Sequence, residues 1–279
     1  MTSPLQREVD ALARSSTHGA VPAGARAVVA QLLAALEAGQ VRAAERGEDD
    51  VWRAVPWVKT GILLAFRIGE LEETAAPPFS FVDKDTLPAR AFTVHEGVRV
   101  VPGGSTIRRG AYVAPGVICM PPMYINVGAH VGDGTMVDSH ALVGSCAQVG
   151  ERVHLSAAAQ IGGVLEPVNA APVVIEDDVI VGGGCGVYEG TVVRERAVLG
   201  AGVILTRGTP VFDLVRETVY RSSADAPLDI PAGAVVVPGA RHISHGWGAE
   251  QHLALQTPVI VKYRDQKTDA ATALESWLR

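Results

Sequence analysis

The stretch GTMVDSHALVGSCAQVG, residues 134–150, repeats one pattern every six residues. Val137, Val143 and Val149 are each followed, four positions later, by a small or β-branched residue. The same phase runs from position 101 to position 161, where every sixth residue is aliphatic except Cys119, and it resumes from position 175 to position 205. The aliphatic column consists of Val101, Ile107, Val113, Ile125, Val131, Val137, Val143, Val149, Leu155, Ile161, Ile175, Val181, Val187, Val193, Leu199 and Leu205.

A strict period of six over this length is typical of a solenoid and not of an ordinary flat sheet, in which spacing would be accidental. Short strands joined at regular corners, with the aliphatic side chain pointing inward, form a parallel β-helix. We predict the left-handed form, with three hexads per coil and about six coils. The insertion EPVNAAP, residues 166–172, interrupts the phase by a length that we interpret as two hexads plus two residues.

The segments on either side of the repeats have other patterns. Residues 1–75 show helical spacing of apolar residues, continuing through 51–71, and Pro77 and Pro78 then indicate a linker. Beyond residue 208 we expect a hairpin, two further strands and a final helix beginning at Thr268 or Asp269. We therefore predict three domains. They are an N-terminal α-helical domain with linker (1–92), the left-handed β-helix (93–208) and a small β-rich C-terminal cap (209–279), in a mainly β protein.

Composition limits the partners. A net charge of −6 gives no basic footprint for nucleic acid or an anionic membrane, so we expect small-molecule substrates. The N-terminus lacks the features of a signal peptide, which favours a cytoplasmic protein. Three cysteines, Cys119, Cys146 and Cys185, lie in apolar surroundings without metal-ligand spacing, and we predict buried free thiols.

Several segments together carry a family resemblance: EGVRVVPGG, RRGAYVAPGVICMPPMYINVGAHVGDGTMVDSHALVGSCAQVG, VHLSAAAQIGGVLEP, VIEDDVIVGG, IPAGAVVVPG and PVIVKYRDQKTDAATALESWLR. Over nearly the full chain, the sequence resembles the tetrahydrodipicolinate N-succinyltransferases of diaminopimelate and lysine synthesis. GTMVD, GSCAQ, HLS and IGGVLEP in that order are specific, whereas isolated hexads would indicate only a solenoid.

The resemblance implies transfer of succinyl from succinyl-CoA to the amino group of 2-amino-6-oxopimelate, the ring-opened acceptor. It also implies a homotrimer with active sites between adjacent solenoids. In the family, the Asp of GTMVD and the Arg of the EGxRVVP segment contact the substrate. These residues are Asp138 and Arg99 here.

The chemistry suits these residue types. An amine that attacks a thioester needs a proton acceptor and a group that orients it, and the carboxylate of Asp138 can do both. The acid ends of a dicarboxylate need cations, for which Arg99, Arg108 and Arg109 qualify by charge. Backbone N–H groups at the corners could stabilise the oxyanion. Because the amine can attack directly, we expect no acyl-enzyme on the nearby side chains Ser139, Ser145, Cys146 and Ser156.

Alternatives remain for each candidate. Asp138 could simply occupy a tight corner, since Asp tolerates left-handed conformations. His140 lies where the family commonly has an aromatic residue, so it could merely fill that space. Many relatives have Arg-Ser-Glu at Gly184–Gly186, where the Glu is a second acid on the substrate amine. Here Glu189 could reach the same place as a substrate-binding residue, Asp138 could act alone, or the acceptor could differ.

Lys262, Arg264 and Lys267 form a basic cluster that could attract the phosphates of the coenzyme, or could be a solvated strand end. We predict no tightly bound cofactor and no metal, with succinyl-CoA as cosubstrate.

The sequence also has to be compared with the patterns of other functions. A zinc hydratase using His130, His140 and His154 is disfavoured because side chains that stack in one solenoid should differ by about 18 residues. A non-catalytic scaffold, acetyl-CoA as donor, and a related amino dicarboxylate as acceptor remain open.

Overall fold

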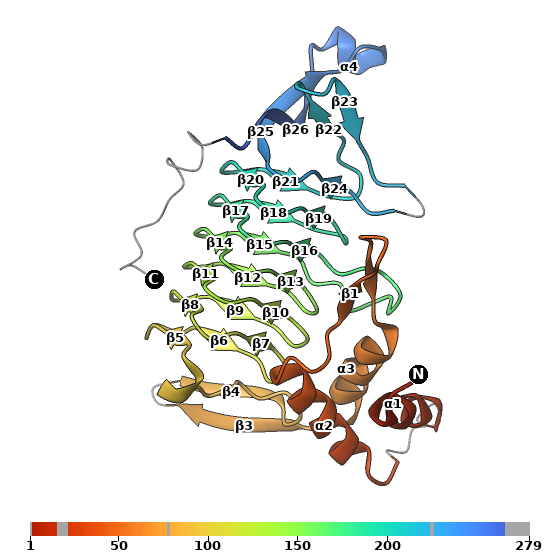
Figure 1. Ribbon diagram of the computed structural model, residues 1–279, viewed down its shortest axis with the longest axis vertical. Coiled ribbons are helices and arrows are strands. Elements are labelled where there is room, and N and C mark those ends of the chain that lie inside the picture. The colour runs from red at the N-terminus through yellow and green to blue at the C-terminus, as the bar shows by residue number, and fades with distance from the viewer. Residues whose placement is uncertain (1, 16–21, 77–78, 224–225, 266–279) are drawn as a thin grey trace.

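The computed structural model describes residues 2–15, 22–76, 79–223 and 226–265. Figure 1 shows a column of short strands with helices at the side of its lower half and a β-rich cap above it. The predicted C-terminal helix and Lys267 lie outside the described residues.

The column is a left-handed parallel β-helix with three faces. Face 1 contains β5 (Arg99–Val100), β8 (Ile118–Cys119), β11 (Met136–Val137), β14 (His154–Leu155), β17 (Ile180–Val181) and β20 (Val198–Leu199). Face 2 contains β6 (Thr106–Ile107), β9 (Tyr124–Ile125), β12 (Leu142–Val143), β15 (Gln160–Ile161), β18 (Gly186–Val187) and β21 (Ile204–Leu205). Face 3 contains β7 (Tyr112–Val113), β10 (His130–Val131), β13 (Gln148–Val149), β16 (Val174–Ile175), β19 (Val192–Val193) and β24 (Asp229–Ile230).

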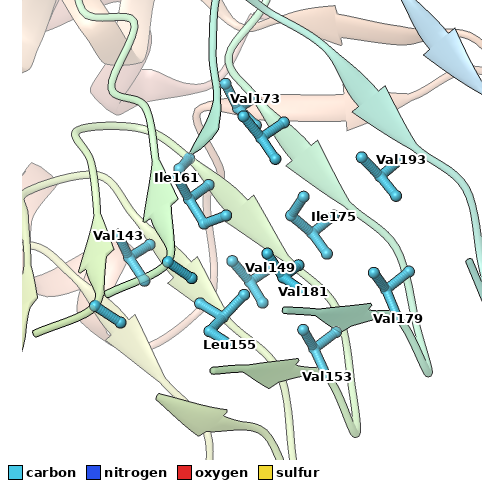
Figure 2. Close-up of a cluster of buried hydrophobic side chains, with 14 of the residues drawn as sticks. Val143, Val149, Val153, Leu155, Ile161, Val173, Ile175, Val179, Val181 and Val193 are labelled. Atoms are coloured by element: carbon cyan, nitrogen blue, oxygen red, sulfur yellow. The ribbon is translucent and has the colours of Figure 1, made fainter. Parts of the chain in front are cut away.

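The register confirms the predicted coil length. Val137 pairs in parallel with Leu155 one coil later, and Val131 pairs with Val149 in the same way. The second residue of each strand of the three faces is buried except Val100 of β5, and Figure 2 shows Val143, Val149, Leu155 and Ile161 packed inside the coils. Each such aliphatic side chain contributes about 1.5–3 kcal/mol when it is removed from water.

The left-handed residue of each corner is not the one that was expected. Positive φ occurs three positions after the inward residue, as at His140 (φ 62°) and Cys146 (φ 65°), and Asp138 is not among these residues. The gap of 14 residues between Ile161 and Ile175 holds no additional strand. Gln148 pairs directly with Val174, so only one corner of one coil is lengthened and no strand is skipped.

The N-terminal region contains α1 (Pro4–Ser15), α2 (Ala25–Glu37) and α3 (Pro56–Ile68), which confirms a helical region. Two hairpins were not predicted: β1 (Ala44–Arg46) with β2 (Trp52–Ala54), and β3 (Leu71–Ala76) with β4 (Phe79–Lys84). The helix expected over 51–71 therefore begins only at Pro56, whose missing N–H fits the first helical turn.

The cap contains the predicted hairpin, β22 (Val211–Asp213) with β23 (Thr218–Tyr220), and the predicted strands as β25 (Ala234–His242) and β26 (Ala254–Tyr263). A short helix, α4 (Gly246–Glu250), joins β25 to β26. Strands β24 and β25 also pair in parallel with β19 and β20, so the stacking of faces 3 and 1 continues beyond the hairpin. The three domain boundaries remain predictions.

Candidate functional site

Asp138 is the first residue of the corner that joins β11 on face 1 to β12 on face 2. Its Oδ1 accepts a hydrogen bond of 2.8 Å from the backbone N–H of Ser139. Asn126, at the same place in an earlier hexad, accepts a 2.8 Å bond from Val127 N–H in the same manner. One carboxylate oxygen of Asp138 thus shapes the corner, while the side chain keeps about a third (32%) of its surface exposed.

The imidazole nearest to Asp138 belongs to His154, which was not predicted for this role. His154 Nε2 lies 4.0 Å from Asp138 Oδ2. His154 is on β14, in register with Met136 of β11 one coil earlier, so the two side chains meet across coils. The 18-residue period of the coils is the signal in the sequence that brings His154 beside the β11 strand, whereas His140 is close to Asp138 only along the chain.

His140 has a different position. It is exposed, it has the left-handed conformation of its corner, and its N–H donates to the carbonyl of Pro122 at 2.5 Å. Its backbone therefore builds the corner, which supports the structural interpretation of this residue.

Arg99 is exposed on β5, at the start of the solenoid. It pairs with Ile118, which pairs with Met136, so Arg99 lies two coils below the strand that precedes Asp138. With strands about 4.8 Å apart, the two residues are separated by roughly 10 Å along the axis of face 1. A dicarboxylate with an amino group could span that interval.

In many relatives a glutamate stands at the position of Gly186, and here the space above this glycine holds the side chain of Tyr188. Gly186 is buried, and a Cβ built on it would meet the ring of Tyr188, with Cε2 at 2.4 Å and Oη at 2.9 Å. The Tyr188 side chain therefore lies over Gly186 on face 2. Sequence reasoning missed Tyr188 because the glycine that accommodates its ring was considered only as a lost carboxylate.

Glu189 is not in the space beside Gly186. It is an exposed corner residue with a φ of 55°, and its Oε2 accepts a 2.6 Å hydrogen bond from the N–H of Arg207. Its corner joins face 2 to face 3, whereas Asp138 lies where face 1 meets face 2. Within one chain, the structure does not bring Glu189 and Asp138 together.

The basic residues are distributed over several contacts. Arg264 Nη1 donates to the carbonyl of Asp178 at 2.9 Å, and Lys262 lies 3.9 Å from Asp265. Arg108 forms an ion pair with Asp83 at 2.5 Å, and Arg109 Nε lies 3.9 Å from Glu37 Oε1. Arg99 thus remains the arginine of this group that lies on the face leading to Asp138.

The predicted burial of the thiols is confirmed for Cys119, Cys146 and Cys185. Desolvation raises the pKa of both Cys119 and Cys146 to about 12. A buried thiol in this state is a poor nucleophile, which is consistent with direct attack by an amine.

The three histidines of the alternative zinc site lie on different parts of the coil. His130 is on face 3, His154 is on face 1, and His140 is at the corner after face 1. Within the described ranges, no three His, Cys, Asp or Glu side chains are grouped to hold a metal ion. Also within those ranges, no helix has the length and apolar character to cross a membrane.

Comparisons with known proteins agree with this fold. Residues 5–68 match the model of the tetrahydrodipicolinate N-succinyltransferase N-terminal region, and residues 172–207 match the hexapeptide repeat of succinyl-transferase. A candidate 2,3,4,5-tetrahydropyridine-2-carboxylate N-succinyltransferase structure from Campylobacter jejuni has a TM-score of 0.52 at 16% identity. That match covers 83% of this chain and 62% of the other, and it supports the fold alone.

Curated relatives extend the match to most of the chain. A 2,3,4,5-tetrahydropyridine-2,6-dicarboxylate N-succinyltransferase of Polynucleobacter asymbioticus is 40% identical, covering 92% of this chain and 91% of the relative. One of Bradyrhizobium diazoefficiens is 39% identical, covering 95% and 92%. The chain belongs to the 2,3,4,5-tetrahydropyridine-2,6-dicarboxylate N-succinyltransferase family of acyltransferases.

Proposed function

We propose that this protein transfers the succinyl group of succinyl-CoA to the amino group of 2-amino-6-oxopimelate, the ring-opened form of tetrahydrodipicolinate. The observation that carries this proposal is the partly exposed carboxylate of Asp138 beside His154, within a family whose relatives are named for this reaction. Arg99, on the same face, is proposed to bind a carboxylate of the acceptor.

The reaction is a direct displacement. The amine nitrogen attacks the thioester carbonyl, the C–N bond forms, and the C–S bond breaks from the tetrahedral intermediate. Asp138 takes the proton that the amine nitrogen loses and passes it to the sulfur of the departing coenzyme, which leaves as its thiol while the carboxylate is regenerated. Asp138 Oδ1 is held by the N–H of Ser139, which leaves Oδ2, on the side of His154, to face the amine.

His154 is proposed as a positioning residue for this carboxylate. A ring nitrogen 4.0 Å from Oδ2 limits the directions in which the carboxylate can turn. When the amine binds, the ring N–H can donate to Oδ2 over a shorter distance, since catalytic hydrogen bonds often shorten only in the substrate complex.

We also propose a homotrimer with the acyl-transfer sites between subunits. Among the polar residues of the outward rows of faces 1 and 2 lie apolar side chains that are only half-buried in the single chain: Met136, Leu142, Ile180, Val198 and Ile204. Face 3, in contrast, is partly covered by the chain's own N-terminal helices, which pack against Val127 and Cys146 at its edge. A second and third copy would bury the uncovered rows, and light scattering of the purified protein tests this stoichiometry.

The direct test is a comparison of succinyl-CoA and acetyl-CoA with the same acceptor, in which thiol release and product mass are both recorded. We expect acceptor-dependent thiol release with succinyl-CoA and formation of the N-succinyl product. Faster turnover with acetyl-CoA would mean that acetyl-CoA, and not succinyl-CoA, is the donor. Thiol release only with another amino dicarboxylate would mean that this compound is the acceptor. No release above background with any pair would favour the non-catalytic scaffold.

The proposed contacts of Lys262 and Arg264 with coenzyme phosphates are weaker candidates. Arg264 already holds the carbonyl of Asp178, and Lys262 lies near Asp265, so each contact would have to be exchanged. Glu189 as a substrate contact would similarly require the loss of its bond to Arg207 N–H.

A further inference from the structure

A cavity of about 380 Å³ lies on face 3, away from the corner that holds Asp138. Trp52 of the β1–β2 hairpin covers one side, and the outward side chains of face 3 form the floor. Its volume is at the lower end of the range for ligand pockets, which suits a molecule of amino-acid size.

Arg42 provides one end of this cavity. Its Nε donates to Gln148 Oε1 at 2.9 Å, and its guanidinium lies 5.5 Å from the centre of the Trp52 ring. Gln148 is only 1% exposed and is itself anchored by a 2.8 Å bond from Nε2 to the carbonyl of Cys146. The guanidinium is therefore held in a fixed orientation by a side chain that cannot move away.

Arg42 has no carboxylate in direct contact in the part of the chain that the structure describes. Burial lowers the pKa of its guanidinium, and Asp177 and Glu45 oppose this only from beyond ion-pair distance. A planar guanidinium binds a carboxylate through two parallel hydrogen bonds, which makes a direct anionic partner favourable here. The Nη donors that Gln148 does not use are suited to such a carboxylate.

Acidic side chains line the edge of the same cavity. Asp133, Glu151 and Asp177 follow β10, β13 and β16 and stack on successive coils, about 4.8 Å apart. The backbone N–H of Glu151 donates to Asp177 Oδ1, and Arg152 Nη1 donates to Glu151 Oε2. The other carboxylate oxygens of the three residues still form an acidic rim. Such a rim attracts an ammonium group and repels phosphates, so it disfavours the coenzyme as the occupant.

Two stacked rings give the cavity a flat and uncharged part of its floor. The rings of Tyr112 and His130 stack with centroids 4.4 Å apart and an angle of 20°. Burial, with a smaller effect from Arg42, lowers the pKa of His130 to about 3, so its ring is neutral at physiological pH. A hydrocarbon side chain could lie against this surface.

We propose that this cavity binds a free α-amino acid, with its carboxylate on Arg42, its ammonium group at the Asp133–Asp177 rim and its side chain over the Tyr112–His130 stack. A small zwitterion carries both of the charges that Arg42 and the acidic rim attract. A bound ligand would join the β1–β2 hairpin to face 3 and so strengthen the contact between the N-terminal region and the solenoid.

Isothermal titration calorimetry on the full-length protein tests this proposal, with individual amino acids as titrants and no acyl-CoA present. We expect saturable binding of at least one amino acid, and loss of that binding for its amide and its N-acetyl derivative, which each lack one charge. Because no turnover is measured, a negative result leaves the transferase proposal intact, and failure of turnover leaves this one intact.

Two variants locate the site. Arg42→Met and, separately, Asp133→Asn should each weaken binding by about tenfold or more, since each removes one charge-assisted contact. Arg53→Met is the matched control, because Arg53 lies in the hairpin that begins two residues after Arg42 but pairs with Asp49 and does not line the cavity. Circular dichroism shows whether each variant is folded. If Arg42→Met does not fold, Asp133→Asn still tests the site.

Three outcomes would overturn the proposal. The first is that no amino acid binds at millimolar concentrations. The second is that the amide or the N-acetyl derivative binds as well as the parent, which would mean a site for a simple anion or cation, and competition by inorganic phosphate would identify the anion. The third is that folded Arg42→Met and Asp133→Asn both bind with unchanged affinity.

Discussion

The corners that hold Asp138 and Glu189 are built from the same hexad, yet their carboxylates differ in what remains available. Asp138 gives one oxygen to the N–H of Ser139 and keeps the other beside His154. Glu189 has a left-handed backbone and accepts the N–H of Arg207 from the next coil. Each carboxylate therefore gives one oxygen to a backbone N–H, and what distinguishes Asp138 is the imidazole of His154 beside its second oxygen.

The largest effect should come from Asp138→Asn. Asn keeps the acceptor for Ser139 N–H, as Asn126 shows for Val127, but cannot take a proton from the amine. We expect turnover to fall by about 10²–10⁴-fold, the range for loss of a general base. Steady-state thiol release measures this, with light scattering and circular dichroism as controls for assembly and fold. Near-normal turnover would remove Asp138 from the mechanism.

A smaller loss is expected for His154→Phe, which keeps an aromatic ring without a ring nitrogen. Turnover should fall by about tenfold, equivalent to about 1.4 kcal/mol of transition-state stabilisation. Because the role is positioning, the acceptor KM should change less than kcat. His154→Gln, which retains a polar group, should recover part of the loss. If His154→Phe had the turnover of the unchanged protein, the ring nitrogen would have no role and the ring would only fill space.

We expect Glu189→Ala to lower the stability of the protein and to leave its turnover unchanged. Removal of the acceptor for Arg207 N–H should lower the free energy of unfolding by about 1 kcal/mol. Urea unfolding measures this, and Glu189→Gln is the matched control because its side-chain oxygen can accept the same bond. A large loss of turnover in a stable Glu189→Gln variant would instead place Glu189 on the substrate.

The smallest effect is expected for His140→Gly. Glycine enters the left-handed region without the steric cost of a Cβ, so stability should rise by less than about 1 kcal/mol, with activity unchanged within about twofold. Thermal unfolding and the thiol assay together measure this variant. A clear loss of activity would return His140 to the site.

The solenoid could be predicted because each hexad repeats the same inward side chain and needs only its neighbouring coils. The β1–β2 hairpin could not, because Trp52 is fixed by a 2.8 Å hydrogen bond from Nε1 to Glu176, a residue far away in sequence. Asp138 and Arg99 were identified from family motifs, and the structure places them on one face and its corner. His154 and Tyr188 were missed because each meets its neighbour through coil stacking or through the space above a glycine.

The assignment of Asp138 and His154 as one catalytic unit is tested most directly by a double-mutant cycle on kcat with Asp138→Asn, His154→Phe and the combined variant. If His154 acts by positioning the Asp138 carboxylate, the combined variant should be no slower than Asp138→Asn alone. If the two losses multiply instead, His154 acts independently of Asp138, and the proposed pairing across the coils is contradicted.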